Sequence, residues 1–216
     1  VFSKEPDLCC KGVFVEFGAR NGIDDSNTYA YETYMGWKGL MYEVDEKEIL
    51  GGLVQNRPNA EIVQAAVCPS DQTSVSIVKG ISGWAGSMDH VEIKRRQIMM
   101  KRNYRGPPQN VTCVHLADEL RQRNMFRVDY MTIDTEGSEL SLVLDFPWNE
   151  FDIRVVQIEQ LKEKYYFSQT GRKEQIVAHM NMHNYTYLRA HPVGDDTLDL
   201  MFSRNLESTT DVFSDA

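Results

Sequence analysis

Long hydrophobic runs are missing from this 216-residue sequence. No apolar run reaches the roughly 18 residues that a membrane-spanning helix needs. The opening residues also lack the basic and apolar regions of a signal peptide. We therefore expect a soluble domain with no membrane span in this chain. The sequence begins at Val1 rather than Met, which is typical of a piece of a longer or processed protein, so the start excludes no upstream anchor or signal.

Basic residues are also scarce: 23 Lys and Arg stand against 32 Asp and Glu, for a net charge of -9. A surface of this charge repels nucleic acid and anionic lipid, which argues against generic nucleic-acid binding. One basic stretch, residues 94–105, contains no acid. It is interpretable as a solvated helix face, as a rim that attracts an anionic acceptor, or as a nucleic-acid site, although Tyr104 is its one stacking ring.

Metal-binding cysteine patterns are absent, since the cysteines show no C-x-x-C spacing and no histidine is placed to complete a zinc site. The four are Cys9, Cys10, Cys68 and Cys113. We expect ordinary thiols. Two N-glycosylation sequons begin at Asn110 and Asn184, and they would matter in a secretory lumen. The compartment stays open, with the cytoplasm favoured and a secretory lumen as the alternative.

What is present is an alternation of strand-like and helix-like segments. Up to residue 67 the expected order is strand, helix, strand, helix, strand, at 12–17, 26–36, 39–44, 45–56 and 60–67. Ser26 and Asp45 are the expected N-caps, and Gly36 the expected end of the first helix. Successive strand–helix–strand units imply a parallel sheet buried on both faces. The predicted class is α/β, doubly wound.

The pattern loosens after Val67 and then returns. Residues 73–80 predict a short strand, and the glycines and prolines of 80–108 predict an excursion with a mobile lid. The sheet is expected to resume with strands at 111–116, 128–137 and 153–160 and helices at 117–125, 138–146 and 172–184. Segments 185–190 and 197–204 predict an antiparallel pair at one sheet edge. With no repeat or linker, we expect one domain over 1–216, its core at about 12–204.

Acidic residues stand at four of the predicted strand ends. They are Glu16, Glu43, Asp134 with Glu136, and Glu159. In an open α/β sheet, ligands bind beyond the carboxyl ends of the strands, where the strand order reverses. Ionised groups gathered at that edge need cations or hydrogen-bonding ligands to offset their repulsion. The sequence therefore predicts a functional site there.

The first turn, within "VFVEFGARNG" at 13–22, indicates the class of ligand. Its spacing, Glu16-x-Gly18-x-x-x-Gly22, departs from the G-x-G-x-x-G fingerprint of dinucleotide sites, which argues against a nicotinamide oxidoreductase. An acid facing the ligand disfavours phosphate and suits S-adenosylmethionine, which is cationic. Gly18 would let the backbone approach this cofactor, Gly22 would ease the turn into the helix, and Glu43 stands where an acid takes ribose hydroxyls.

Five segments together resemble the successive motifs of the FkbM family of S-adenosylmethionine-dependent methyltransferases. They are "FVEFGARNGIDDSNT", "GWKGLMYEVD", "NRPNAEIVQAAV", "VDYMTIDTEGSEL" and "VVQIE". The resemblance implies a Rossmann-like, seven-stranded class I methyltransferase sheet, mostly parallel with the antiparallel edge pair. It also implies transfer of a methyl group, in known members to hydroxyls of sugars or natural products. The alternative is a methyltransferase-fold interaction module without turnover.

The resemblance implies a set of cofactor contacts. These are Glu16, Gly18, Gly22, Asn27, Glu43, Ala65, Ala66 and Asp134. The first four would surround the methionine end, Glu43 would bind the ribose, and the alanines would lie beside the adenine. The partner is then a small-molecule or glycan acceptor, whose identity the sequence leaves open together with the oligomeric state.

The segment "IDTEGSE", residues 133–139, admits two interpretations. In one, Asp134 caps a helix that starts near Ser138, Glu136 bonds local backbone, and Glu139 is a first-turn acid favoured by the helix dipole. In the other, Asp134 and Glu136 face the methyl group as candidate catalytic residues, together with Glu159. The same three carboxylates, Asp134, Glu136 and Glu159, would suit a divalent cation such as Mg²⁺.

The histidines predict less chemistry. His179 and His183 stand four apart on a predicted helix without a Glu-x-x-His frame, so a solvated or partly packed face is favoured over a metal site. His191 is expected in the loop that joins the last two strands, where it is a candidate base. Trp84 is expected to pack rather than to line an acceptor pocket.

Overall fold

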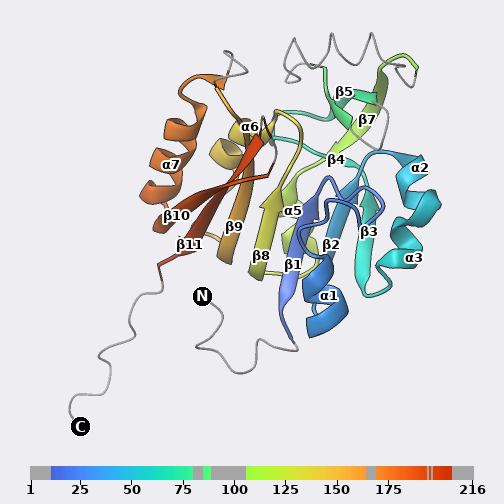
Figure 1. Ribbon diagram of the computed structural model, residues 1–216, viewed down its shortest axis with the longest axis horizontal. Helices are drawn as coiled ribbons and strands as arrows, with labels where there is room; N and C mark the ends of the chain where they lie inside the picture. The colour runs from blue at the N-terminus through green and yellow to red at the C-terminus, as the bar shows by residue number, and fades with distance from the viewer. Residues whose placement is uncertain are drawn as a thin grey trace.

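The main sheet has seven strands in the order β10-β11-β9-β8-β1-β2-β3 (Figure 1). The computed structural model describes residues 11–79, 85–88, 106–163, 169–193, 195 and 197–205. The strands are β1 Val13–Phe17, β2 Lys38–Glu43, β3 Ala60–Gln64, β8 Arg127–Ile133, β9 Asp152–Leu161, β10 Tyr185–Pro192 and β11 Thr197–Arg204. The predicted seven-stranded, doubly wound sheet is confirmed.

Strand direction refines the prediction at one edge. Strands β3, β2, β1, β8 and β9 are parallel, and the strand order reverses between β1 and β8. Strand β11 pairs antiparallel with both β9 and β10, so β10 runs with the parallel set. The edge thus holds one inserted antiparallel strand. Because β10 extends to Pro192, His191 is a strand residue, and its expected place in a loop is wrong.

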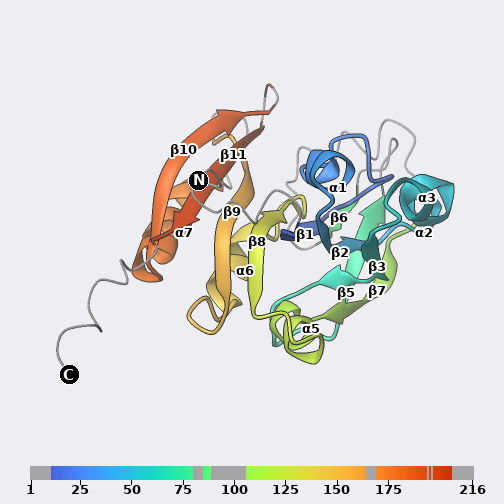
Figure 2. The same ribbon diagram turned by 90° about the horizontal axis from the view of Figure 1, so that it is seen from below.

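Helices cover both faces of this sheet (Figure 2). On one face lie α1 Tyr29–Met35 and a continuous run of α2 Glu46–Glu48, η3 Ile49–Leu53 and α3 Val54–Asn56. On the other face lie α5 Leu116–Gln122, α6 Glu139–Asp145 and α7 Arg172–Met182. As predicted, α1 ends at Gly36, which adopts a left-handed φ of 67°.

Only one of the two predicted N-caps in the first half is confirmed. The Asp45 carboxylate accepts from the Lys47 N–H at 3.2 Å and caps α2. Helix α1 instead begins after Thr28, with no side-chain cap, and the Ser26 hydroxyl donates to the Glu16 carboxylate. Ser26 is therefore wrong as an N-cap, because a buried acid nearby takes its hydroxyl.

A second sheet lies beyond the carboxyl ends of β1 and β2, in the order β4-β7-β5-β6 (Figure 1). Its strands are β4 Ala66–Val67, β5 Ser74–Lys79, β6 Ala85–Ser87 and β7 Gln109–Val114. The predicted third strand at 60–67 therefore divides: the chain leaves the main sheet after Gln64, and β4 pairs with β7. The main sheet does not resume at 111–116 as expected, but at β8.

Two cysteines cross-link this second sheet. Ala66 pairs with Cys113, and Cys68 lies just beyond β4, so the two Cα atoms of Cys68 and Cys113 are 5.5 Å apart and the residues form a disulfide. That separation is typical of disulfides. The expectation of ordinary thiols is wrong for this pair, because a pairing between segments 45 residues apart is invisible in the cysteine spacing.

The predicted lid at 80–108 is only partly within the described residues. Its residues 85–87 form β6, an ordered strand paired with β5. Trp84, His90 and the basic stretch 94–105 lie outside the described residues.

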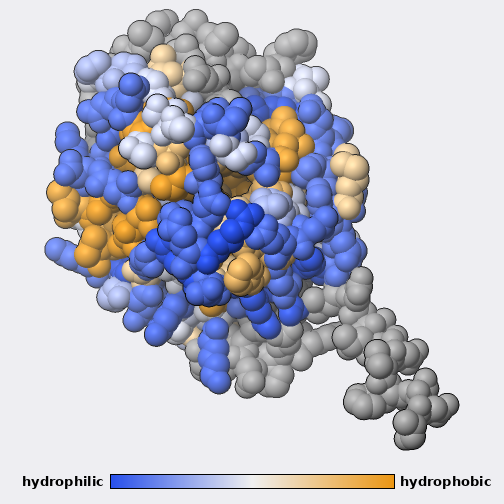
Figure 3. Space-filling view, turned by 180° about the vertical axis from the view of Figure 1, so that it is seen from behind, coloured by the Kyte–Doolittle hydropathy of each residue, from blue (hydrophilic) through white to orange (hydrophobic). Residues whose placement is uncertain are grey.

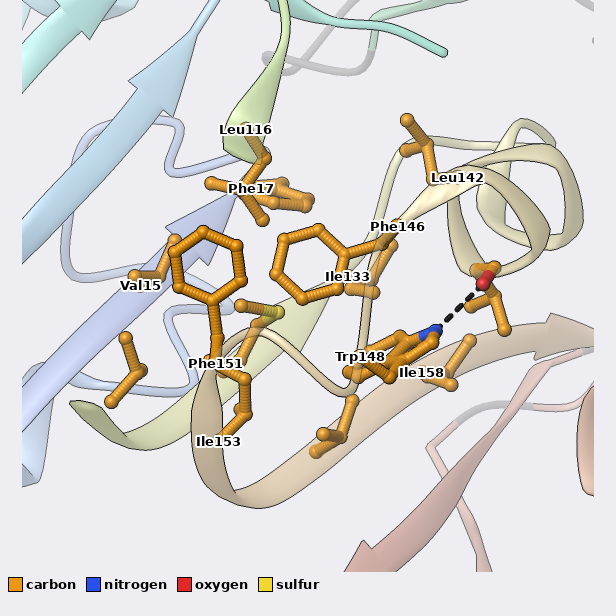
Figure 4. Packing of buried hydrophobic residues seen from close by; sticks show 14 of the residues in the cluster. Val15, Phe17, Leu116, Ile133, Leu142, Phe146, Trp148, Phe151, Ile153 and Ile158 are labelled. Atoms are coloured by element: carbon orange, nitrogen blue, oxygen red, sulfur yellow. Dashed lines mark hydrogen bonds between the residues drawn. The ribbon is translucent and has the colours of Figure 1, made fainter. Parts of the chain in front are cut away.

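Apolar clusters pack against both faces of the main sheet. Its larger apolar cluster packs on the α5–α7 side, where the rings of Phe146 and Phe151 lie 5.3 Å apart beside Trp148 (Figure 4). Trp148 is fully buried, and its Nε1–H donates to the Val143 carbonyl at 2.7 Å. A second cluster packs on the α1 side around Phe14, Trp37 and Leu53, so both faces are anchored.

The surface seen from behind is mainly hydrophilic, with smaller hydrophobic patches (Figure 3). Among the described residues, no helix combines the length and the hydropathy that crossing a bilayer requires.

Candidate active site

A cavity of about 610 Å³ lies at the carboxyl ends of the main-sheet strands, where the strand order reverses. Its volume suits a small molecule, and the position is the usual one for ligands of open α/β sheets. Residues of β4, β5 and β6 form one wall. The acids among the described lining residues are Asp25, Glu43, Asp134, Glu136, Glu159 and Asp199, and the one basic residue among them is Arg20.

Most of the predicted cofactor residues reach this cavity. Gly18, Asn27, Glu43, Ala65, Ala66 and Asp134 all line it. The candidate catalytic residues Glu136 and Glu159 line it as well. Glu16 and Gly22 are not among its lining residues.

Glu16 is buried beneath the loop that leads into α1 and is 2% exposed. Its Oε1 accepts from the Asn27 N–H at 2.8 Å, and its Oε2 accepts from the hydroxyls of Ser26 and Thr28. Burial raises the pKa of Glu16, while the Thr28 hydrogen bond and the charge of Arg57 oppose that rise. The expectation that this carboxylate faces the ligand is wrong, because the protein itself occupies both oxygens; Glu16 anchors the loop instead.

Arg57 completes this buried network, and sequence reasoning missed it. Its Nη1 lies 3.5 Å from Glu16 Oε2, and its Nε donates to Glu32 Oε2 at 2.6 Å. The same guanidinium donates to the Gly22 carbonyl at 3.2 Å. A Cβ at Gly22 would lie 2.5 Å from Arg57 Cγ, so this glycine makes room for the arginine rather than for a cofactor. The sequence signal that could have identified Arg57 is its place in "NRPN", the start of a segment that resembles the family.

Gly18 is required by a close approach between two strand ends. Its φ is 72°, and a Cβ there would lie 2.5 Å from the Asp134 carbonyl oxygen. A left-handed φ at such a contact favours glycine alone. Gly18 therefore brings the end of β1 against the end of β8 and holds Asp134 at the cavity.

Glu43 lines the cavity as predicted, but its oxygens already hold backbone amides. Oε2 accepts from the Arg20 N–H at 2.7 Å, and Oε1 accepts from the N–H groups of Val44 at 2.8 Å and Asp45 at 2.7 Å. A carboxylate offers about four lone-pair positions, so Oε2 keeps about one for a ligand. Burial raises the pKa of Glu43, and the hydrogen bond from the Asp45 amide is the largest opposing influence.

The segment "IDTEGSE" brings Asp134 and Glu136 to the cavity, as the second interpretation has it, but its backbone and the role of Glu139 differ from both interpretations. Strand β8 ends at Ile133, and Glu136 takes a left-handed φ of 58°, so the strand geometry does not extend to it. Ser138 precedes α6 without a side-chain capping bond. Glu139, expected to be a simple first-turn acid, accepts from the N–H groups of Thr135 at 2.9 Å and Gly137 at 2.8 Å. Glu139 is thus the residue that fixes the loop.

Among the described residues, the acids that lie close enough together to share an ion are not the predicted set. Oxygens of Asp134, Glu139 and Glu159 lie within 4.8 Å of one another, so Glu139 takes the place predicted for Glu136. Glu139 has a structural task, because its Oε1 holds the loop and Arg172 Nη2 lies 3.9 Å from its Oε2. This proximity alone does not define a cation site.

A polar row crosses the sheet on the α1 side, just below the cavity. Thr132 of β8 is in register with Glu16 of β1 and Gln157 of β9. Asn27 bridges the row from above: its Nδ2 donates to Thr132 Oγ1 at 3.3 Å, and its Oδ1 accepts from Gln157 Nε2 at 2.8 Å. Gln157 Nε2 also donates to Asp199 Oδ2 at 2.7 Å. Sequence reasoning missed Gln157 and Asp199, whose signal is a polar residue inside an otherwise apolar buried strand.

The remaining histidines agree with the packing interpretation. The ring of His179 on α7 and the ring of His183, just after the end of α7, lie 4.6 Å apart, and neither residue lines the cavity. Burial lowers the pKa of His179, and the neighbouring His183 lowers it further. A metal role at this pair gains no support from the described residues.

The strand order and the cavity at its reversal define a class I methyltransferase fold. Residues 16–191 match the family model described as the methyltransferase FkbM domain. That match spans well over half of the sequence, so the chain belongs to the FkbM methyltransferase family, as the motifs predicted. Family and fold together make it an S-adenosylmethionine-dependent methyltransferase.

Several solved methyltransferase structures are similar at low identity. A human methyltransferase 10 domain containing protein aligns with a TM-score of 0.49 and 12% identity, over 93% of this chain and 74% of its own. The Methanococcus jannaschii fibrillarin pre-rRNA processing protein aligns with a TM-score of 0.49 and 9% identity, over 91% of this chain and 68% of its own. A putative type 11 methyltransferase from Sulfolobus solfataricus aligns with a TM-score of 0.44 and 9% identity, over 94% of this chain and 90% of its own. The fold assignment rests on the strand order and not on these scores. No curated protein matches the chain.

Proposed function

We propose that this protein transfers a methyl group from S-adenosylmethionine to a hydroxyl group of a small-molecule or glycan acceptor. The observation that carries the proposal is the acidic lining of the cavity. Its one described basic residue, Arg20, pairs with Asp25 and so brings no free positive charge. A carboxylate-lined site favours a cationic cofactor and repels the pyrophosphate of a dinucleotide.

The cavity lining suits the separate parts of that cofactor. Glu43, with a lone pair of Oε2 free of backbone bonds, is suited to a ribose hydroxyl. Apolar residues of the wall, such as Ala65, Val75 and Ile77, are suited to the adenine. Asn27 and Asp134 lie where the amino-acid end would sit, and an ammonium group would offset the acid there.

For methyl transfer the protein must align the acceptor hydroxyl with the methyl group and remove the hydroxyl proton. Bound S-adenosylmethionine supplies a methyl group already activated by its sulfonium, so no covalent enzyme intermediate is needed. The residues that line the cavity would orient the acceptor hydroxyl and exclude water. Asp134, Glu136 and Glu159 are candidates for contact with the acceptor. Because they are acidic, we propose a neutral acceptor over an anionic one.

We propose that the reaction needs no divalent cation. Glu139, which lies with Asp134 and Glu159 in the acidic group described above, is committed to the loop of Thr135 and Gly137 and to Arg172. Chelation of divalent cations distinguishes this proposal from the predicted cation at Asp134, Glu136 and Glu159.

The experiment is a methyl-transfer assay with labelled S-adenosylmethionine across neutral glycans, polyols and their phosphorylated or carboxylated counterparts. Label incorporated into a neutral hydroxyl acceptor supports the proposal. Cofactor binding in calorimetry without transfer to any acceptor contradicts it and favours the interaction module. Transfer confined to anionic acceptors would uphold methylation and overturn the neutral-acceptor class.

We also propose an oxidising compartment, such as a secretory lumen, in place of the favoured cytoplasm. The Cys68–Cys113 disulfide and the exposed side chains of Asn110 and Asn184, both in sequons, support it. Glycosidase treatment of the protein made in secretory cells should shift its mass. An unmodified, fully reduced protein from such cells would contradict the assignment.

A further inference from the structure

A second row of polar residues crosses the sheet at the cavity. In the antiparallel ladders, Asp199 of β11 lies opposite Glu159 of β9 and opposite His191 of β10. Directly opposed residues on neighbouring strands point to the same side of a sheet. Met201, two residues on, packs in the cluster on the α1 side, which puts Asp199 on that face. Asp199 and Glu159 both line the cavity.

The Asp199 side chain is held in one orientation by Gln157. The two N–H bonds of Gln157 Nε2 go to Asn27 Oδ1 and Asp199 Oδ2, and its Oε1 accepts from the Tyr130 hydroxyl. With all three contacts made, the amide cannot be flipped without loss of a hydrogen bond. Only Oδ2 of Asp199 is bonded in this way. Within the part of the chain that the structure describes, no donor forms a hydrogen bond to Oδ1.

We propose that Asp199 is the proton acceptor of the methyl transfer, that Gln157 is its positioning residue, and that the acceptor hydroxyl binds at the β9–β11 end of the cavity. This inference rests on the proposed function. In the step, the acceptor oxygen forms a bond to the methyl carbon and the bond from that carbon to sulfur breaks, with its electron pair going to sulfur. The hydroxyl proton goes to Oδ1 of Asp199.

The electrostatics of the site agree with this role. Burial raises the pKa of Asp199 from 3.8 to about 6, and the charge of His191 opposes that rise. A general base is most effective when its pKa lies near the working pH. The titratable groups that face Asp199 from the adjoining strands are Glu159 of β9 and His191 of β10, and Tyr130 of β8 reaches it through Gln157.

If the role of Asp199 were purely structural, Asp199→Asn would leave methyl transfer almost unchanged. In Asp199→Asn the amide oxygen can still accept from Gln157 Nε2, so the polar row is preserved. What the variant loses is the capacity to take a proton. Asp195→Asn is the matched control, because Asp195 is exposed and does not line the cavity.

The test measures kcat/KM with the neutral acceptor of the panel that the wild type methylates fastest, and affinity for S-adenosylhomocysteine by calorimetry. Asp199→Asn should lower kcat/KM by about 10² to 10⁴ with cofactor affinity unchanged, the range for loss of a general base. Asp195→Asn should match the wild type. A kcat/KM for Asp199→Asn within about threefold of the wild type overturns the inference and leaves O-methylation standing.

A second readout needs no acceptor. Carboxyl ¹³C NMR should show Asp199 titrating with a midpoint near 6 in the free protein. Gln157→Leu should raise that midpoint, since it removes a hydrogen bond to the charged form. A midpoint at the ordinary value for aspartate overturns the inference, including in the case where no acceptor is methylated and the proposed function itself has failed.

Discussion

The Nε–H of Arg57 donates to Glu32 Oε2 at 2.6 Å, and both side chains are almost completely buried. The same guanidinium lies 3.5 Å from Glu16, so one positive charge serves two buried carboxylates. Through Glu16 this arrangement holds the loop of Ser26 and Asn27 against the sheet. The cavity wall on the α1 side thus depends on a charge from the far end of α3.

Arg57→Met should lower the free energy of unfolding by about 3–5 kcal/mol, because removing one partner leaves buried carboxylates uncompensated. Urea unfolding with an unchanged m-value would measure it. The matched control is Arg121→Met, whose ion pair with Glu150 lies at the surface and is screened by solvent, so its loss should cost far less stability than the loss of Arg57. Equal effects of the two substitutions would contradict the special role of Arg57.

Glu43→Gln should weaken S-adenosylhomocysteine binding by about 2–3 kcal/mol, since an amide accepts less strongly than a carboxylate and can turn a donor toward the backbone amides. It should also lower stability, because the N–H groups of Arg20, Val44 and Asp45 all depend on this carboxylate. Calorimetry and thermal unfolding separate the two effects. Glu46→Gln, on the exposed side of α2, is the control. Wild-type affinity in a folded Glu43→Gln protein would remove Glu43 from the site.

Stability should depend on pH through Asp199. Its pKa is about 6 in the folded protein against 3.8 as the ordinary value, so the folded state binds the proton more readily. Stability should therefore fall as pH rises from about 4 to about 6. Asp199→Asn should raise Tm at pH 7.5, and the gain should vanish below about pH 4, where Asp199 is protonated in both states. A lower Tm for the variant at pH 7.5 would disagree with this electrostatic account.

Replacement of both Cys68 and Cys113 by alanine should cost about 2–4 kcal/mol, the usual range for a disulfide that closes a long loop. Reduction of the wild type should have the same effect. Alkylation with and without reduction, followed by mass spectrometry, identifies the linked pair. Alkylation of Cys68 and Cys113 in the unreduced protein would show that the disulfide is not formed in solution.

Removal of divalent cations should leave turnover unchanged within about twofold, because general-base transfer needs no Lewis acid. EDTA treatment followed by addition of Mg²⁺ tests this. Activity lost in EDTA and restored by Mg²⁺ would contradict the cation-free mechanism and would favour the predicted cation.

Glu139→Gln should instead lower stability, since the N–H groups of Thr135 and Gly137 lose a charged acceptor.

Much of the architecture was predictable because it depends on short-range patterns. A period of two or of 3.6 residues identifies a strand or a helix within its own segment. Gly36 ends α1 by adopting a left-handed φ, and Asp45 caps α2, both through contacts a few residues away. Acids at successive strand ends meet in one cavity because parallel strands share an edge.

The tertiary structure alone decided where the buried charges point and which distant segments pair. Glu16 points away from the cavity because it contacts Arg57, which is 41 residues later in the sequence. Position 22 is a glycine because a larger side chain there would clash with Arg57. The break after Gln64 follows from the pairing of β4 with β7 and the Cys68–Cys113 disulfide. Asp199 meets Glu159 and His191 through strand register. Such contacts depend on long-range pairing, which leaves no local periodicity in the sequence.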